Sequence, residues 1–439
     1  MTETLYFLRG IFAALSEDSA LWLTLMPMLI AVELPLYLLV MTGVFRWTAH
    51  QDVSGDQRQT TPGISVIITC YGEGDAIAIT IDTLVEQLYG GEIEILPVID
   101  GAVQNQHTYV AALAAKRKYA GVKNRPVRLV PKWQRGGRVS TLNAGLSEAS
   151  HSIVINVDGD TSFDNDMVRT IVNMLQQPKY LACGGALRVR NWRQNLLTRM
   201  QALEYMLSMQ MGKTGMATWG VLNNISGAFG AFHRDILERA GGWDTHTAED
   251  LDLTMRLKQY KTRYPDKSLG FATHAIGHTD VPDTVKGLVM QRLRWDGDLL
   301  FLFLRKHRQG LTPKLLGWGN FLFVFVYGVL QNVLLPLLVL GFTVWLVVVY
   351  PPTVVIALMT ALYLTYLGLL LLSFVAYTGF ISERPRTDIS MAVWLPLYPV
   401  YLFLMRMVTA FSMVNEVLRR SHEESSMAPW WVLKRGKRF

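Results

Sequence analysis

The sequence predicts an α/β domain with a buried, largely parallel sheet, inserted between an N-terminal membrane helix and a C-terminal α-helical membrane region. Two observations predict this fold class. Long apolar runs lie near both ends of the 439-residue chain, and between them short apolar runs typical of strands alternate with helix-like segments. Continuous apolar strands in a βαβ order are typical of a parallel sheet that helices cover on both faces.

Three apolar runs are long enough to cross a bilayer, because a helix of about 20 residues spans a hydrocarbon core of ~30 Å. They are residues 21–45, 317–350 and 353–380. The first contains one charged residue, Glu33, and the other two contain none. A shorter apolar segment at 389–405 contains Pro396 and Pro399, which favours a re-entrant or interfacial segment there.

The charges flanking these runs predict an orientation. The loop after the third run holds Arg384 and Arg386, and the tail after Glu416 is rich in lysine and arginine. The positive-inside rule places both the loop and the tail in the cytoplasm. A single complete crossing by residues 389–415 would put them on opposite sides, so we expect that this segment does not make one. The central domain is two crossings away from that loop, so we expect it in the cytoplasm. Part of the net charge of +7 is explained by these flanking residues, and no nucleic-acid partner is expected.

Two further observations limit the kinds of protein that the sequence can encode. Glu3 and Arg9 are atypical of a cleaved signal peptide, so we expect the N-terminal segment to be retained. The two cysteines, Cys70 and Cys183, form neither a disulfide framework nor a CxxC motif, and no HExxH pattern is present. The sequence therefore does not support a thiolate zinc site or zinc catalysis.

The central domain begins with three βα units. Strands are expected at 64–69, 93–99 and 152–157, and helices near 75–88, 105–119 and 138–149. In a parallel sheet the carboxyl ends of the strands meet at one edge, where ligands bind. A methionine-containing helix over 200–216 is expected to rest on lipid or on the core.

The strongest local signal is a DxD segment, Asp158 and Asp160, at the end of an apolar strand. Side chains two apart share a face of an extended chain, so both carboxylates can point into one cleft. Such a pair is suited to Mg²⁺ or Mn²⁺ bound together with substrate phosphates. An Asp-Gly turn after a strand is the structural alternative.

A second acidic site is the Glu249–Asp250 pair at the start of a helix that Thr247 is expected to cap. Acidic residues are favoured in a first helical turn, which is the structural alternative. A carboxylate at a cleft edge can, however, act as a general base for a hydroxyl group, and Asp250 is the candidate.

The third motif, residues 291–295, reads QRLRW and precedes the first C-terminal span. Gln291 can bind hydroxyl groups, Arg294 can hold a diphosphate, and Trp295 offers a flat face to a sugar ring. A basic and aromatic membrane anchor is the alternative. Weaker segments are Gly136 to Arg138, which can present an arginine to phosphate, and the polar and small residues at 223–228.

In this order, the motifs resemble those of the processive family 2 glycosyltransferases, which include cellulose, hyaluronan, chitin-oligosaccharide and poly-N-acetylglucosamine synthases. The resemblance covers roughly residues 20–415 and rests on the series D, DxD, ED and Q(Q/R)xRW. It is greatest to bacterial poly-N-acetylglucosamine synthase. It implies a GT-A-like nucleotide-sugar domain.

The resemblance also implies roles for individual residues. The donor nucleotide would be bound by Tyr71, Glu73, Asp100, Arg138, Asp158 and Arg294, and the metal by Asp158 and Asp160. The acceptor would be bound by Ser226, Gly227, Gln291 and Trp295, with Asp250 and Glu249 as the catalytic pair. The family commonly has a lysine where Arg138 stands.

Five regions follow from these assignments. They are an N-terminal membrane segment (1–48), a cytoplasmic glycosyltransferase domain (49–280), the QRxRW motif with interfacial helices (281–316), the membrane spans with the re-entrant or interfacial segment (317–415), and a basic cytoplasmic tail (416–439).

The expected function is inverting, Mg²⁺- or Mn²⁺-dependent polymerisation of sugar from a UDP-sugar, by resemblance UDP-N-acetylglucosamine, into a biofilm exopolysaccharide that crosses the bacterial inner membrane. Expected partners are the nucleotide-sugar donor, the growing polysaccharide, membrane lipid and envelope export proteins. Two alternatives remain: transfer of a single sugar to a lipid or short acceptor, and a transporter or receptor whose soluble domain merely binds nucleotide.

Overall fold

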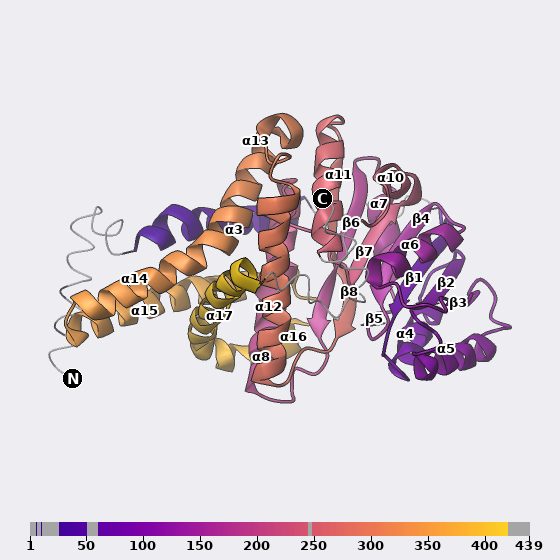
Figure 1. Ribbon diagram of the computed structural model, residues 1–439, viewed down its shortest axis with the longest axis horizontal. Coiled ribbons are helices and arrows are strands. Elements are labelled where there is room, and N and C mark those ends of the chain that lie inside the picture. Colours follow the sequence, from indigo (N-terminus) through magenta and orange to yellow (C-terminus); the bar gives the residue numbers. More distant parts are fainter. Residues whose placement is uncertain (1–5, 7–9, 11–25, 51–59, 245–247, 420–439) are drawn as a thin grey trace.

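In the computed structural model, which describes residues 6, 10, 26–50, 60–244 and 248–419, an eight-stranded sheet forms one side of the molecule (Figure 1). The strand order is β3-β2-β1-β4-β7-β6-β8-β5. The strands are β1 (Ile64–Cys70), β2 (Ile93–Ile99), β3 (Val130–Pro131), β4 (Ile153–Asp158), β5 (Ser162–Phe163), β6 (Tyr180–Val189), β7 (Phe229–His233) and β8 (Ser268–Thr279).

The first half of the sheet confirms the predicted βα units. Strands β1, β2, β3 and β4 are parallel, and every residue of β1 and β2 is buried, as their continuous apolar sequences require. The intervening helices are α4 (Ala76–Val85), α5 (Gln106–Lys118) and α6 (Arg138–Glu148). The register pairs Cys70 with Ile99 and Thr69 with Asp158, so the three strands end at one edge of the sheet.

The second half of the sheet is mixed. Strand β7 lies antiparallel between β4 and β6, β5 lies antiparallel to β8, and β6 and β8 are parallel. The helices of this half are α7 (Met167–Leu175), α8 (Leu196–Glu204), η2 (Tyr205–Met211), α9 (Gly212–Thr218), α10 (Arg234–Arg239) and α11 (Glu249–Thr262). The predicted methionine-containing helix corresponds to α8, η2 and α9, and most of its methionines are buried.

Helices form the rest of the molecule. Next to the sheet domain are α12 (Val285–Phe301) and η3 (Leu302–Lys306); beyond them are η1 (Leu29–Glu33), α3 (Leu34–Ala49), α13 (Pro313–Phe323), η4 (Val324–Leu334), α14 (Leu335–Val349), α15 (Pro352–Ala376), η5 (Tyr377–Ile381), α16 (Pro385–Asp388), η6 (Ile389–Leu397) and α17 (Tyr398–Arg419). Helices α14 and α15 lie side by side at the end of the molecule away from the sheet (Figure 1).

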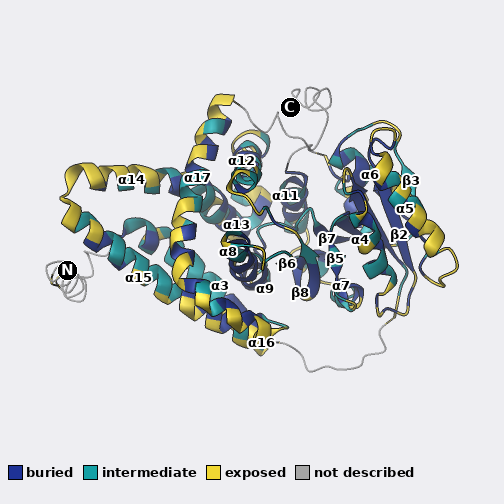
Figure 2. Ribbon diagram, turned by 90° about the horizontal axis from the view of Figure 1, so that it is seen from below, coloured by how far each residue is buried: buried dark blue, intermediate teal, exposed yellow. Residues whose placement is uncertain are grey.

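Four helical segments within the described residues are long and apolar enough to cross a membrane: Leu29–Ala49, Pro313–Val349, Pro352–Ile381 and Pro385–Arg419. Exposed residues follow the outer faces of α14, α15 and α17, as expected for helices that contact lipid (Figure 2). Residues 21–25 of the first predicted span and 420–439 of the predicted cytoplasmic tail lie outside the described residues.

The segment expected to be re-entrant or interfacial is part of a helical stretch, Pro385–Arg419, that is long enough for a crossing. Pro396 lies in η6, a 3₁₀ portion of this stretch. Because proline has no main-chain amide hydrogen, one hydrogen bond of the helical stretch is missing at this position. How often this stretch crosses the membrane stays a prediction.

The first membrane helix packs unusually closely against the sheet domain. Helix α3 crosses α9 at Gly43 and Gly215, and a Cβ atom at Gly43 would overlap the main-chain oxygen of Gly215. A Cβ atom at Gly215 would likewise overlap the main chain of Val40. Small residues let helix backbones approach in this way.

Replacing Gly43 with alanine should therefore destabilise the protein by about 1–3 kcal/mol, because a methyl group at this crossing forces the two backbones apart. Thermal unfolding of the purified protein in lipid nanodiscs measures the effect. The control is Gly341→Ala in α14, where a new Cβ meets no atom within 4 Å and alanine is the better helix former. Equal unfolding temperatures for both variants would contradict the prediction.

Candidate functional site

Every residue that the sequence predicts for the site lines one cavity of about 810 Å³ between the sheet and the membrane helices. The set is Tyr71, Glu73, Asp100, Arg138, Asp158, Asp160, Ser226, Gly227, Glu249, Asp250, Gln291, Arg294 and Trp295. The residues come from the carboxyl ends of β1, β2 and β4, the start of α6, the segment before β7, the start of α11 and the middle of α12. The structure thus brings all four motifs together, whereas the role of each residue stays a prediction.

Three carboxylates crowd one end of the cavity. Asp158 is the last residue of β4, and Asp160 follows two residues later. Burial raises the pKa of Asp160 above its ordinary value, and the charge of Asp158 adds to this effect. Burial likewise raises the pKa of Glu73 to about 7, with further contributions from Asp158 and Asp160, and its buried Oε2 has no hydrogen-bond partner among the described residues.

This donor set fits a hard divalent cation. Carboxylates that repel one another in a buried site are stabilised by a cation, and Mg²⁺ binds through one or two carboxylates together with substrate phosphates and water. No group of three or more histidine, cysteine or acidic side chains in the described part of the chain is arranged as a complete metal site. A cation at Asp158 and Asp160 would therefore take its other ligands from the substrate and water.

Arg138, the first residue of α6, joins three of the motifs. Its guanidinium donates to Asp158 Oδ1 (2.6 Å), to the main-chain oxygen of Gly227 (2.6 Å) and to Glu249. Burial alone would lower the pKa of Arg138, but Asp158 and Glu249 hold it above the ordinary value. The sequence predicts Arg138 as a donor-binding residue, yet here its charge connects protein groups, and its contact with the donor stays a prediction.

Asp100 organises the loop that precedes α6. Its carboxylate accepts hydrogen bonds from Lys132 Nζ (2.6 Å) and from the main-chain amides of Gly136 and Gly137 (2.8 Å each). Gly137 has a φ of 83°, which a glycine adopts without strain. Because these donors occupy both carboxylate oxygens, Asp100 shapes this wall of the cavity whether or not it also contacts a nucleotide.

Tyr71 lies where the same loop meets the end of β1. The guanidinium of Arg135 lies 3.9 Å from the centre of its ring. A flat stack of this kind at the cavity wall can receive a further planar group.

The acidic pair at the start of α11 divides into two environments. Asp250 Oδ2 accepts from Asn224 Nδ2 (2.8 Å) and from the main-chain amide of Gly227 (3.2 Å), so the segment before β7 fixes its carboxylate. Glu249 is buried against Arg138, and burial raises its pKa although the arginine opposes this. Asp250 therefore faces the cavity, whereas Glu249 is mainly an ion-pair partner. The predicted cap, Thr247, lies outside the described residues.

The QRLRW motif lies on α12, where Gln291, Arg294 and Trp295 share a face toward the cavity. Arg292 also lines the cavity, but its guanidinium pairs with Glu204 of α8 (2.7 Å), which in addition accepts a hydrogen bond from Tyr401 of α17 (2.8 Å). This pair fixes α12 between the sheet domain and the last helix.

Sequence reasoning missed a second group of residues that line the same cavity: Glu204, Lys213, Lys258, Asp296, Asp298, Tyr327, Gln331 and Asn332. Some carried a signal. Gln331 and Asn332 are amides within an otherwise apolar run, and polar residues inside a membrane helix indicate a functional surface. Lys258 follows Leu251 and Met255 at helical spacing on an apolar face.

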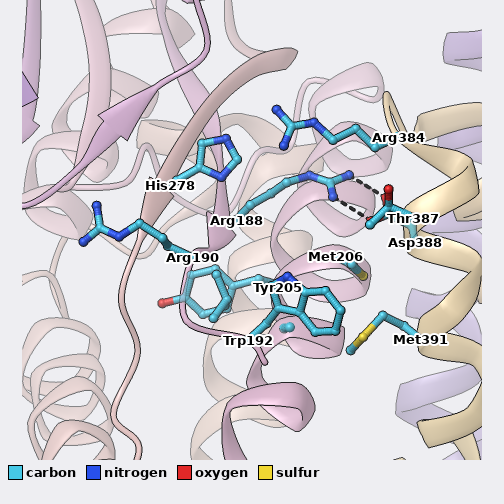
Figure 3. Close-up of a pocket in the computed structure, with 12 residues that line it drawn as sticks. Arg188, Arg190, Trp192, Tyr205, Met206, His278, Arg384, Thr387, Asp388 and Met391 are labelled. Carbon is cyan, nitrogen blue, oxygen red and sulfur yellow. Dashed lines mark hydrogen bonds and ion pairs between the residues drawn. The ribbon is translucent and has the colours of Figure 1, made fainter. Parts of the chain in front are cut away.

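A second cavity of about 200 Å³ lies between the sheet and the loop that precedes α16 (Figure 3). Arg188 of β6 makes a bidentate ion pair with Asp388 (2.7 and 2.9 Å), and Arg384 of the loop pairs with Asp164 (2.7 Å). Arg190 donates to the main-chain oxygen of Asp160 (3.1 Å). These contacts place the sheet domain and this loop on the same side of any membrane that the helices cross.

Comparison with known proteins identifies similar chains. The model of the glycosyl transferase family group 2 matches residues 153–408. The poly-beta-1,6-N-acetyl-D-glucosamine synthase of Staphylococcus epidermidis is 30% identical over 241 residues, which are 54% of this chain and 55% of that protein. The synthase of Staphylococcus aureus strain MSSA476 is 29% identical over 248 residues, 56% of this chain and 55% of that one. The chain thus spans about half the length of the curated relatives it matches.

Among solved structures, the mannosyltransferase PcManGT of Pyrobaculum calidifontis, in complex with GDP-Man and Mn²⁺, superposes with a TM-score of 0.54. The match covers 90% of this chain and 98% of that one at 17% sequence identity. At this identity the likeness shows the fold, and it confirms the predicted fold class.

Proposed function

Because the chain belongs to the glycosyl transferase family group 2, we propose that it is an inverting, metal-dependent enzyme that polymerises sugar from UDP-N-acetylglucosamine and passes the product across the bacterial inner membrane. The observation that carries the proposal is the shared cavity, which runs from the acidic edge of the sheet to η4 in the membrane region. A donor at the sheet edge and an acceptor toward the helices would meet at Asp250.

Asp250 is placed to act as the general base. The hydroxyl oxygen of the acceptor forms a bond to the anomeric carbon as the bond from that carbon to the diphosphate breaks. The hydroxyl proton passes to the Asp250 carboxylate, and the nucleoside diphosphate leaves with the bonding electron pair. Attack from the face opposite the leaving group inverts the anomeric configuration. Asn224 and the Gly227 amide support this role by fixing the carboxylate.

Asp158 and Asp160 would hold Mg²⁺ or Mn²⁺ at the diphosphate. A cation bound there supplies positive charge as the leaving group becomes more negative. Arg294 of α12 lines the same cavity and can hold the diphosphate, and Trp295 and Gln291 can stack on and hydrogen-bond the acceptor sugar. Ser226 and Gly227 would line the acceptor side beside Asp250.

Replacing Asp160 with asparagine should raise the Mn²⁺ concentration needed for half-maximal activity at least about tenfold, because even outer groups of metal sites contribute that much. Mn²⁺ binding followed by electron paramagnetic resonance checks the result independently of turnover. Asp166→Asn, which removes an exposed carboxylate at the start of α7, is the matched control and should bind Mn²⁺ as the wild type does. Unchanged Mn²⁺ affinity in Asp160→Asn would remove this residue from the metal site.

The identity of the sugar and the polymeric product rest on similarity to the staphylococcal synthases. The cytoplasmic location of the sheet domain rests on the positive-inside rule, together with the contacts that join Arg384 to the sheet domain. Export proteins of the envelope are the expected partners of such a synthase.

The proposal is tested by incubating membranes that contain the protein with a panel of nucleotide sugars and Mg²⁺ or Mn²⁺. The expected result is release of UDP from UDP-N-acetylglucosamine and a high-molecular-weight product that a linkage-specific hydrolase degrades. A product one sugar longer than its lipid or short acceptor would instead establish the non-processive alternative. Nucleotide binding without UDP release would contradict both.

A further inference from the structure

Lys258 is the most unusual charged residue of the large cavity. Lys258 lies in the middle of α11 and lines the cavity, and only 1% of its surface is exposed to solvent. Its Nζ has no hydrogen-bond or ion-pair partner within the described part of the chain. Removing an ammonium group from water without a partner costs several kcal/mol, so such groups are rare unless a ligand completes them.

Among the residues that the structure describes, no carboxylate forms an ion pair with Lys258. Burial lowers the pKa of Lys258 to about 7, and the charge of a second lysine, Lys261, adds to this effect. The ammonium lies 5.3 Å from the ring centre of Phe323 on α13, and that ring stacks on Tyr327 of η4 (5.1 Å). This part of the cavity is therefore walled by a membrane span and contains a basic group that becomes fully charged only when an anion binds beside it.

Lys258 and Asp250 lie on the same helix, so their separation along the helix axis can be estimated. Asp250 lies at the start of the same helix, eight residues earlier. At a rise of 1.5 Å per residue, the two positions are about 12 Å apart along the helix axis. A molecule that presents a hydroxyl group to Asp250 would have to extend over a separation of this order to reach Lys258 as well.

We propose that Lys258 is the anion-binding end of the acceptor site, and that the acceptor on which a chain is started carries a phosphate group beyond the sugar whose hydroxyl is glycosylated. The inference rests on the proposed role of Asp250 at the other end. Phosphate oxygens accept hydrogen bonds from an ammonium group strongly. Because Phe323 and Tyr327 belong to a membrane span, the phosphate can belong to a lipid-linked saccharide or to a soluble one.

The test compares three acceptors with the full-length protein in nanodiscs: a neutral disaccharide, the same disaccharide with a phosphate at its reducing end, and that phosphate esterified to a long alkyl chain. The wild type should show a KM at least tenfold lower for the phosphorylated acceptors than for the neutral one. A gain for the alkyl phosphate alone identifies a lipid-linked acceptor, and a gain for both identifies phosphate from either source. Equal KM values for all three would overturn the inference.

In Lys258→Met the ratio of KM values should fall to about one. This ratio compares the neutral with the phosphorylated acceptor in the same variant, so a loss of activity that affects both acceptors equally does not change it. Lys261→Met is the matched control, because Lys261 lies one turn further along α11 and donates to the main-chain oxygen of Gly220. It removes a neighbouring positive charge and should keep the ratio. A preference that survives in Lys258→Met would overturn the inference.

Stability provides a second readout. A buried ammonium retained for a ligand destabilises the free protein, so Lys258→Met should unfold at a higher temperature than the wild type. A lysine that served only the fold would give the opposite shift, which would count against the inference. The wild type alone should be stabilised against heat more by the phosphorylated than by the neutral acceptor, and this measurement needs no variant. If no acceptor were glycosylated at all, the proposed function would fail rather than this inference.

Discussion

Replacing Asp250 with asparagine should lower the rate of sugar transfer by about 10²- to 10⁴-fold, the usual contribution of a positioned general base. The asparagine oxygen can still accept hydrogen bonds from Asn224 and from the Gly227 amide, and only the bond that the other Asp250 oxygen accepts from the Leu251 amide is lost, so most of the contacts that fix this side chain should be kept. The loss should therefore fall on kcat, with little change in the affinity for the nucleotide sugar. Release of UDP measures turnover, and equilibrium binding of the nucleotide sugar measures affinity.

The control for this variant is Asp266→Asn, which removes an exposed carboxylate just beyond α11 and should turn over at the wild-type rate. If Asp250→Asn made polymer at the wild-type rate, the base would have to be another group. A fall in donor affinity equal to the fall in rate would instead indicate that Asp250 serves to bind the donor.

The second large effect is expected for Arg138→Met. Removing the guanidinium leaves the buried Glu249 without its cationic partner, and breaking a buried ion pair in this way costs about 3–5 kcal/mol. The DxD carboxylate Asp158 and the main-chain oxygen of Gly227 lose donors in the same step. We therefore expect both a lower unfolding temperature and a large loss of activity.

The loss of stability in Arg138→Met should depend on pH, and the direction of this dependence can be derived. Burial already raises the pKa of Glu249, and removing Arg138 removes the attraction that opposes this rise. A carboxyl group whose pKa is raised by folding destabilises the protein at pH values above its unfolded pKa, and protonation relieves the cost. The difference in unfolding temperature between Arg138→Met and the wild type should thus be larger at pH 7.5 than at pH 5.5.

Two further variants sharpen the result. Arg138→Lys keeps a positive charge but loses the planar set of donors, so it should fall between the wild type and Arg138→Met. Arg239→Met removes an exposed arginine paired with Asp235 on α10 and should change stability by less than about 1 kcal/mol. Equal stability of Arg138→Met and the wild type would contradict the structural role assigned to Arg138.

The first half of the sheet could be predicted closely because its signals are local. Each of β1, β2 and β4 is a short apolar run followed by a turn and a helix, and the observed bounds differ from the expected ones by about one residue. Strand β7 was not predicted. Its position between β4 and β6 depends on pairing with residues far away in the chain, such as Val157 with Phe229, which no local pattern reveals.

The candidate site divides in the same way. The residues that form motifs were predicted, and they share one cavity, because a turn at a strand end or the first turn of a helix constrains position strongly. The sequence could not show that Arg138 would bridge Asp158 and Glu249, since this depends on how α6 packs beside α11. The spacing of Lys258 behind Leu251 and Met255 placed it on the apolar face of α11, but the sequence could not show that α13 would pack against this face and bury the lysine.

The glycine contact between α3 and α9 has a practical consequence. Helix α9 continues from η2, which lines the cavity at Tyr205, Ser208 and Met209, and Gly215 of α9 lies directly against the first membrane helix. The first membrane helix therefore holds one side of the cavity in place and does more than anchor the enzyme in the membrane. A soluble fragment that began after residue 50 would expose the face of α9 next to the active centre, and trimming the chain in this way should yield an inactive, aggregation-prone product.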